Sequence, residues 1–187
     1  MNHDQPLIVQ SDKTIFLEVD SPQFAEARDQ LGAFAELVKC PEHVHTYRIS
    51  PLSLWNAASS GMQAEDVIEI LKRYSRYPVP ANVEADIVEY MGRYGRLVLF
   101  ESDGGLALRA DDPLLLDEVC RHKKIAPYIA ERLDPHTARV SGGYRGHLKQ
   151  ELIKLGYPVK DLAGYVPGAP LEIDLRQVSR EGEEFSL

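Results

Sequence analysis

The chain has 187 residues, of which 44% are hydrophobic, and this is enough for one large or two small domains with buried cores. Its net charge of -8 argues against a protein that coats nucleic acid through general positive charge. The two cysteines, Cys40 and Cys120, lie far apart and outside any Cys-x-x-Cys pair, so neither a disulfide framework nor a zinc knuckle is suggested, and a reducing compartment fits.

Short strands and one helix are predicted in the first forty residues. Residues 7–10 and 14–19 alternate as strands around a turn. Ser21-Pro22 places a capping residue before a proline, which is typical of a helix start, and Gly32 suits the end of that helix. Residues 34–39 fit either a third strand or a continuation of the helix.

A winged-helix-like core is predicted over about residues 43–110. Residues 43–49 alternate as a strand, and Ser50-Pro51 then begins a helix. Two further helical patterns and a β-hairpin over residues 96–109 follow, and three helices with a hairpin are the order of a winged-helix unit. With the flanking short strands, this predicts a first domain over residues 1–110.

A second, small mixed α/β domain is predicted over residues 111–176. Its signals are a helix from Asp111-Asp112-Pro113 to about Arg121, a strand over 138–141, a helix through Leu148, Leu152 and Leu155, and a strand over 171–175. Residues 177–187 are polar and are predicted to be a linker. The fold class predicted for the chain is therefore α+β.

Positive charge is concentrated in one segment of this acidic chain. Residues 121–160 hold nine Lys and Arg against three Asp and Glu, which suggests contact with phosphate or an acidic partner. The candidate DNA-binding residues are Lys123, Lys124, Tyr144, Arg145, His147, Lys149 and Lys154, with Tyr157 as a further stacking candidate. An ordinary solvated surface is the alternative interpretation.

A secondary basic cluster comprises Lys72, Arg73 and Arg76 at the end of a predicted helix. For this cluster the structural interpretation is favoured, because cations at a helix C-terminus stabilise the helix dipole without any ligand.

No catalytic residue or metal site is predicted. His43 and His45 share a strand face without a third ligand at a metal-binding spacing. Leu114-Leu-Leu-Asp117-Glu118 resembles an ATPase box, but its cap predicts a helix, and no Gly-x-x-x-x-Gly-Lys-Ser/Thr loop occurs. Cys120 near His122 lacks an orienting third group. No apolar run approaches the roughly 20 residues of a membrane helix, and no signal pattern opens the chain.

The sequence resembles the XPB family of DNA repair helicases in two blocks. The first spans residues 43–61, which begin His-Val-His-Thr-Tyr, and continues through residues 70–80 and 94–97. The second comprises residues 148–158 and 171–175, similar to the segment that precedes the helicase motor in the family. The resemblance implies an N-terminal domain and a damage-recognition-like domain of a prokaryotic-type member.

This resemblance implies a superfamily 2, ATP-dependent 3′–5′ DNA helicase or translocase of nucleotide excision repair, which in eukaryotes is also a subunit of transcription factor IIH. The phosphate loop, the Asp-Glu box, and the Arg-Glu-Asp and thumb elements of the family are absent from this sequence. We therefore expect a non-catalytic N-terminal portion that is not itself an enzyme, with ATP and Mg²⁺ bound by a motor outside the chain.

The expected partners are DNA, as a forked or damaged duplex, the helicase motor itself, and a partner nuclease of the kind that prokaryotic relatives use. The expected location is the cytoplasm, at the nucleoid. The alternative function is a free-standing winged-helix DNA-binding regulator or a protein-interaction module.

Overall fold

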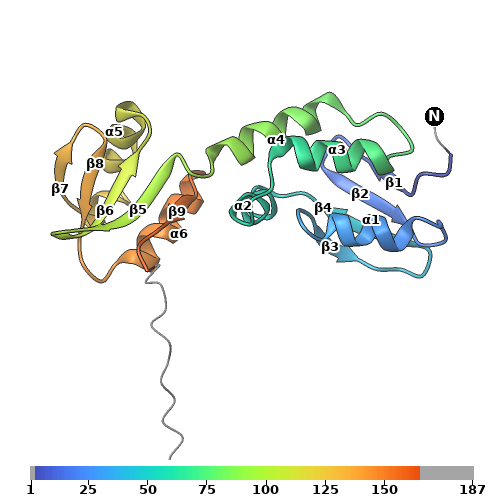
Figure 1. Cartoon of the computed structure of the whole chain (residues 1–187), viewed down its shortest axis with the longest axis horizontal. Coiled ribbons are helices and arrows are strands. Elements are labelled where there is room, and N and C mark those ends of the chain that lie inside the picture. Colours follow the sequence, from blue (N-terminus) through green and yellow to red (C-terminus); the bar gives the residue numbers. More distant parts are fainter. Residues whose placement is uncertain (1–2, 165–187) are drawn as a thin grey trace, which may run out of the picture.

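The computed structural model describes residues 3–164 and shows two units, each with its own sheet and buried core (Figure 1). This confirms the predicted mixture of helices and strands. The strand predicted over 171–175 and the linker predicted over 177–187 lie outside the described residues. No helix within the described part of the chain is both long and apolar enough to cross a membrane.

The first sheet has four antiparallel strands in the order β1-β2-β4-β3. Its strands are β1 (Leu7–Val9), β2 (Thr14–Glu18), β3 (Glu36–Lys39) and β4 (Val44–Arg48). The ambiguous segment over 34–39 thus contains an edge strand. Pairing with β4 decides between strand and helix here, because such long-range contacts override weak local preference.

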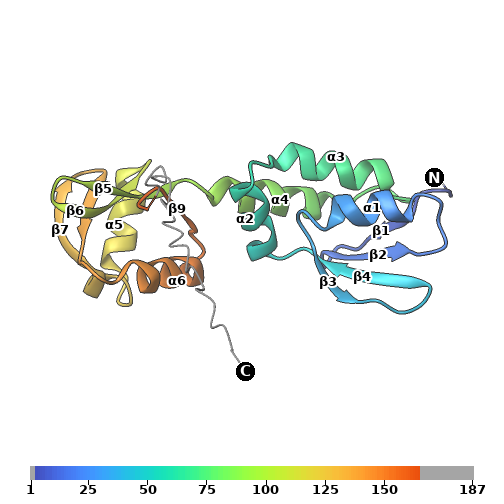
Figure 2. The ribbon, with the colours of Figure 1, turned by 60° about the horizontal axis from the view of Figure 1, so that its bottom comes forward.

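Four helices complete the first unit: α1 (Phe24–Leu31), α2 (Pro51–Ser59), α3 (Ala64–Tyr74) and α4 (Ala81–Arg93). Figure 2 shows α1 and α3 on one side of the sheet. Their apolar faces pack with alternate strand residues such as Ile15, Leu17 and Tyr47 in one core. α1 begins later than Ser21-Pro22 predicts, because those residues form a turn before the helix.

The predicted strand-to-helix junction at Ser50-Pro51 is confirmed. The hydroxyl of Ser50 accepts a hydrogen bond from the backbone N–H of Ser53 at 3.1 Å, and the Ser53 hydroxyl accepts one from the Ser50 N–H at 2.9 Å. This reciprocal capping satisfies backbone donors that a helix start leaves unpaired. The Trp55 indole N–H then donates to the Tyr90 carbonyl at 2.8 Å and ties α2 to α4.

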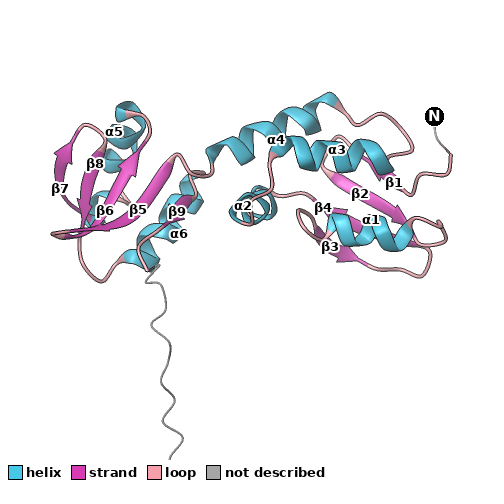
Figure 3. Cartoon of the chain, in the orientation of Figure 1, coloured by secondary structure: helices cyan, strands magenta, loops and turns pink. Residues whose placement is uncertain are grey.

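The second sheet has five strands in the order β7-β8-β6-β5-β9, and only the β5–β9 pair is parallel (Figure 3). Its strands are β5 (Leu97–Ser102), β6 (Gly105–Ala110), β7 (Ile129–Asp134), β8 (Thr137–Val140) and β9 (Val159–Asp161). The helical segments of this unit are α5 (Pro113–Arg121), a short 3₁₀ turn (Ala126–Tyr128) and α6 (Arg145–Leu155).

Both long helices of the second unit lie on the same side of its sheet (Figure 2). Leu116 of α5 and Leu152 of α6 are fully buried against strand residues such as Leu97 and Leu108. Asp112 caps α5 by accepting from the Leu114 N–H at 2.9 Å. The other side of this sheet carries neither helix.

The β5–β6 hairpin was predicted to pack with the three helices in a winged-helix-like core over residues 43–110, but it lies in the second unit. It pairs with β8 and β9 in the second sheet, and its buried leucines belong to the second core. The structure therefore does not confirm the winged-helix arrangement, and the two cores separate near residues 94–96 rather than at 110. A hairpin pattern specifies a local turn but not the sheet that completes it.

The two units are connected by α4, which leads directly into β5 (Figure 1). At this junction the Arg93 guanidinium lies 5.3 Å from the ring of Tyr90 and 5.7 Å from the ring of Tyr157 in the second unit. Its Nη1 donates to the Gly156 carbonyl at 3.4 Å. Arg93 is thus a specific contact between the units.

Two strands of the second sheet have no counterpart in the sequence prediction. Five of the six residues of β7 are exposed, so the strand lacks the apolar alternation that would identify it. β9 has only three residues, too few for the apolar alternation that identifies a strand. Both strands form because the β5–β6–β8 edges are available for pairing.

Candidate nucleic-acid interface

The N-terminal half of α6 places two of the predicted basic residues beside one carboxylate. Arg145 and Lys149 are four residues apart and therefore share a helix face. The Asp161 carboxylate accepts a hydrogen bond from Arg145 Nε at 2.7 Å and lies 3.0 Å from Lys149 Nζ. Asp161 is the residue directly after the basic segment over 121–160, and it offsets part of that segment's charge.

The Asp161 side chain is only 11% exposed and also accepts from the Ala163 N–H at 3.0 Å. Burial alone would raise the pKa of this carboxyl, but the hydrogen bonds and charges of Lys149 and Arg145 outweigh burial and hold its pKa below the ordinary value. The carboxylate is therefore charged at neutral pH. Arg145 and Lys149 remain 45% and 38% exposed, so both can still reach a phosphate.

An aromatic cluster lies at the start of α6, on a different face of the helix from these two cations. The ring centroids of Tyr128 and Tyr144 are 5.4 Å apart, and His147 stacks on Tyr128 at 6.4 Å with an interplanar angle of 22°. Tyr144 is 47% exposed and His147 is exposed. The cluster combines predicted residues with one that was not predicted, and exposed rings of this kind can stack on nucleic-acid bases.

Lys123 and Lys124 lie in the exposed turn between α5 and the 3₁₀ turn that ends at Tyr128. Neither makes an ion pair with any carboxylate of residues 3–164. Like Arg121 and Lys160, they are exposed cations of the basic segment without a carboxylate partner among the described residues, and Tyr128 connects their turn to the aromatic cluster.

The remaining predicted cations have intramolecular partners. Lys154 pairs with Glu151 on its own helix at 3.1 Å. In the secondary cluster, Lys72 pairs with Glu84 at 3.1 Å and Arg73 with Glu69 at 2.8 Å, while Arg76 pairs with Glu18. Tyr157, the further stacking candidate, packs on Arg93 at the junction between the units.

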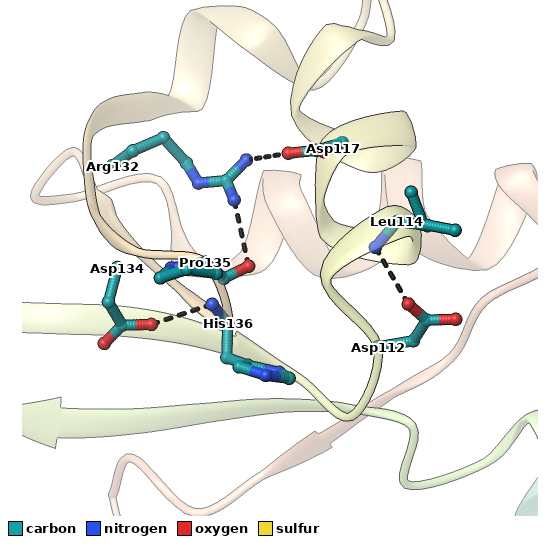
Figure 4. Close-up of polar contacts among 7 residues, drawn as sticks. All are labelled: Asp112, Leu114, Asp117, Arg132, Asp134, Pro135 and His136. Atoms are coloured by element: carbon teal, nitrogen blue, oxygen red, sulfur yellow. Dashed lines mark hydrogen bonds and ion pairs between the residues drawn. The ribbon is translucent and has the colours of Figure 1, made fainter.

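Arg132 of the basic segment stabilises a loop. Figure 4 shows its guanidinium between the Asp117 carboxylate, at 2.6 Å, and the Pro135 carbonyl, at 3.0 Å. In the same loop Asp134 accepts from the His136 N–H at 2.7 Å. These contacts tie the β7–β8 turn to α5. Arg132 therefore contributes more to the fold than to a phosphate-binding surface.

Two important residues of this surface were not predicted: Asp161 and Tyr128. The charge of residue 161 was visible in the sequence, but its pairing with α6 depends on the parallel β5–β9 contact. Tyr128 follows a proline-containing turn without periodicity, and only the fold brings it to Tyr144.

The geometry gives little support to a metal site at His43 and His45 or to a nucleophile at Cys120. His43 lies 3.4 Å from Asp20, and His45 packs edge-on against Phe24, so the two histidines have separate neighbours. Burial raises the pKa of the Cys120 thiol, which disfavours a thiolate nucleophile.

Within residues 3–164 no three His, Cys, Asp or Glu side chains are grouped to hold a metal ion. The sequence also contains no phosphate loop.

Comparison with known proteins identifies a family. The sequence matches the helicase conserved C-terminal domain over residues 7–134. It is 51% identical to the DNA 3′-5′ helicase XPB of Kineococcus radiotolerans over 175 residues, which cover 93% of this chain and 31% of that protein. It is 52% identical to the DNA 3′-5′ helicase XPB of Mycobacterium tuberculosis, with 93% and 32% coverage.

A more distant relative is the general transcription and DNA repair factor IIH helicase/translocase subunit XPB of Dictyostelium discoideum, which is 30% identical over 163 residues, covering 78% of this chain and 20% of that protein. The chain thus spans about a third of the length of its bacterial relatives and less of this one.

The match corrects one expectation. From the missing phosphate loop we expected the chain not to be an enzyme, but it carries a conserved helicase domain and is similar to XPB helicases over most of its length. The expectation was wrong because it depended on a single motif. A phosphate loop is only one segment of a helicase, and a conserved helicase domain can be recognised in a sequence that lacks it.

Proposed function

The chain belongs to the helicase conserved C-terminal domain family, and on this premise we propose that it is the DNA-engaging portion of an XPB-like 3′–5′ DNA helicase or translocase of nucleotide excision repair. ATP and Mg²⁺ would serve the complete helicase, in the cytoplasm at the nucleoid. The DNA is a forked or damaged duplex.

One observation carries this proposal: cations and aromatic rings gather around the N-terminal half of α6 and the turn that ends at Tyr128, with Arg145 and Lys149 on one face of the helix and His147 on another. We call this the α6 surface and define it as Lys123, Lys124, Tyr128, Tyr144, Arg145, His147 and Lys149. Cations supply the sequence-independent affinity for phosphate, and exposed rings add stacking wherever bases are unpaired. In this role the second unit corresponds to the damage-recognition-like domain that the sequence resemblance implies.

The test is a comparison of two variants in DNA binding. Replacement of Lys123, Lys124, Arg145 and Lys149 by Ala should weaken binding to a fluorescent forked DNA. The slope of log K against log salt should flatten by about 0.9 for each phosphate that is no longer neutralised. Lys72→Ala with Arg73→Ala, outside the α6 surface, is the control and should change neither quantity. Unchanged affinity of the quadruple variant would refute the assignment.

A second candidate function is the docking of protein partners, such as the helicase motor or a nuclease, by the first unit. The observation that favours it is the edge strand β3, on which Leu37 and Val38 are each 52% exposed. Exposed apolar residues on an unpaired strand edge are typical of a site for protein contact. No binding of the wild-type chain to forked DNA at physiological salt would favour this docking role alone.

A further inference from the structure

The side of the second sheet that faces away from α5 and α6 carries apolar, aromatic and positively charged side chains. Strand residues alternate, so Leu97 and Leu99 enter the core, whereas Val98 and Phe100 point to the opposite side. Both are only partly buried. Figure 2 shows that the two helices lie across the sheet from this side. It is therefore a second surface, separate from the α6 surface.

Two cations flank Val98 on this uncovered side. Val98 pairs with Arg109 in β6 and with Lys160 in β9, so the three side chains lie in one row across the sheet. Arg109 and Lys160 are two strand spacings apart, or about 10 Å. Both side chains are exposed.

Neither cation is neutralised by the described part of the chain. No carboxylate of residues 3–164 lies within ion-pair distance of Arg109 or Lys160. The Arg109 guanidinium instead lies over the Phe100 ring, 5.1 Å from its centroid. An aromatic ring and a flat cation thus form a continuous platform beside a second positive charge.

This row forms one wall of a groove between the two units. The groove has a volume of about 660 Å³, and its opposite wall comes from the first unit, including Met62, Glu65 and Val88. A second hollow of about 310 Å³ continues from it and shares Val98 and Arg109. Arg109 therefore lies at the centre of a path that crosses the uncovered side of the sheet.

We propose that this groove binds a single strand of DNA, with neighbouring phosphates at Arg109 and Lys160 and an unpaired base on the Phe100–Arg109 platform next to the groove. Cations that follow the backbone and rings that accept bases are the two requirements of single-strand binding. A duplex does not fit this chemistry, because its bases face each other and cannot reach Phe100. The inference rests on the proposed function, and it assigns a strand of the fork to a site distinct from the α6 surface.

The experiment compares binding of a fluorescein-labelled oligo(dT) of 20 nucleotides and a fully paired duplex of the same length to the whole chain. Arg109→Ala with Lys160→Ala should weaken binding of oligo(dT) about tenfold and flatten its salt slope by about 1.4, or 0.7 for each phosphate of a single strand. Affinity for the duplex should change less than twofold. Lys72→Ala with Arg73→Ala removes the same charge elsewhere and should leave oligo(dT) binding unchanged.

Phe100→Leu separates stacking from charge. It should weaken oligo(dT) binding by about fivefold or more, in the range for removal of one base stack, without changing the salt slope. Thermal unfolding by circular dichroism verifies that each variant is folded.

The outcomes separate this inference from the proposed function. If the groove variants bind oligo(dT) as the wild type does, while the quadruple variant of the α6 surface binds DNA poorly, the groove inference is overturned and the proposed function stands. If the wild-type chain binds neither oligo(dT) nor duplex nor forked DNA, both are overturned.

Discussion

Asp161 offers the sharpest test of how DNA affinity is set on the α6 surface. Its carboxylate is held between Arg145 and Lys149, so both cations are partly occupied by the chain itself. Asp161→Asn removes the negative charge but keeps the size of the side chain and one acceptor oxygen for the Ala163 N–H. We expect the variant to bind duplex DNA more tightly than the wild type.

The magnitude follows from counterion release. Releasing two cations that are partly occupied in the wild type should steepen the salt slope by up to about 1.8, the value for two further duplex phosphates. Between 50 and 200 mM salt, the affinity of the variant should therefore fall by up to roughly tenfold more than that of the wild type. The assay is fluorescence anisotropy with a duplex at four or more salt concentrations.

The same substitution should lower stability. Removing the charged interactions with Arg145 and Lys149 costs about 1–2 kcal/mol, a value reduced for the partial exposure of both cations. The folded pKa of Asp161 lies below its ordinary value, so this stability is present above about pH 3.9 and is lost as the pH falls through the folded pKa. Urea unfolding should show a constant difference between wild type and variant from about pH 5 to 8, and almost none below the folded pKa.

Two outcomes would refute this reasoning. An unchanged salt slope would mean that Arg145 and Lys149 do not reach phosphate when released. Weaker DNA binding by a variant that is folded at the assay temperature would mean that Asp161 positions the two cations productively instead of occupying them.

Two further predictions concern the fold, both measured by urea unfolding. Ser50→Ala removes the acceptor of the α2 cap and should lower stability by about 1 kcal/mol, whereas Ser50→Asp should preserve it. Gly156→Ala should cost about 1–2 kcal/mol, because residue 156 has a φ of 93° and an added Cβ would lie 3.0 Å from Arg93 Nη1. Unchanged unfolding midpoints would contradict the structural roles given to the cap and the left-handed position.

The elements that the sequence predicts well are those specified by local chemistry. Ser50-Pro51 and Asp112-Pro113 start helices because cap and proline act within one turn. Such signals need no knowledge of the partner elements.

The sheet partners of the hairpin over 96–109 could not be predicted in this way. A hairpin preceded by three helices satisfies the order of a winged-helix domain, yet its outer edges pair with β8 and β9, which follow it in sequence. The buried leucines of β5 and β6 are compatible with any apolar partner. Which core the hairpin joins depends on the relative stability of the two possible arrangements of the whole chain. That difference cannot be inferred from the local sequence.

For the candidate site, the sequence identifies which residues carry charge but not which charges remain available. The segment over 121–160 is strongly basic when residues are counted, yet Arg132, Arg139 and Lys154 have carboxylate partners in the fold. Conversely, Arg109 lies outside that segment and has no carboxylate partner among the described residues. Counting therefore overestimates the α6 surface and misses Arg109 of the groove.

This distinction explains how a chain of net charge -8 can be expected to bind DNA. Affinity for phosphate depends on the charges within about one Debye length, roughly 8 Å at physiological salt, and not on the total. Lys123 and Lys124 follow α5, which covers one side of the second sheet. Arg109 and Lys160 lie on the other, uncovered side of that sheet, in the groove. Acidic residues farther away than one Debye length are largely screened, whereas Glu65 lies in the groove wall and Asp161 contacts Arg145 and Lys149. Two separate positive surfaces on opposite sides of one small sheet suit a branched DNA, whose duplex and single strands leave the junction in different directions.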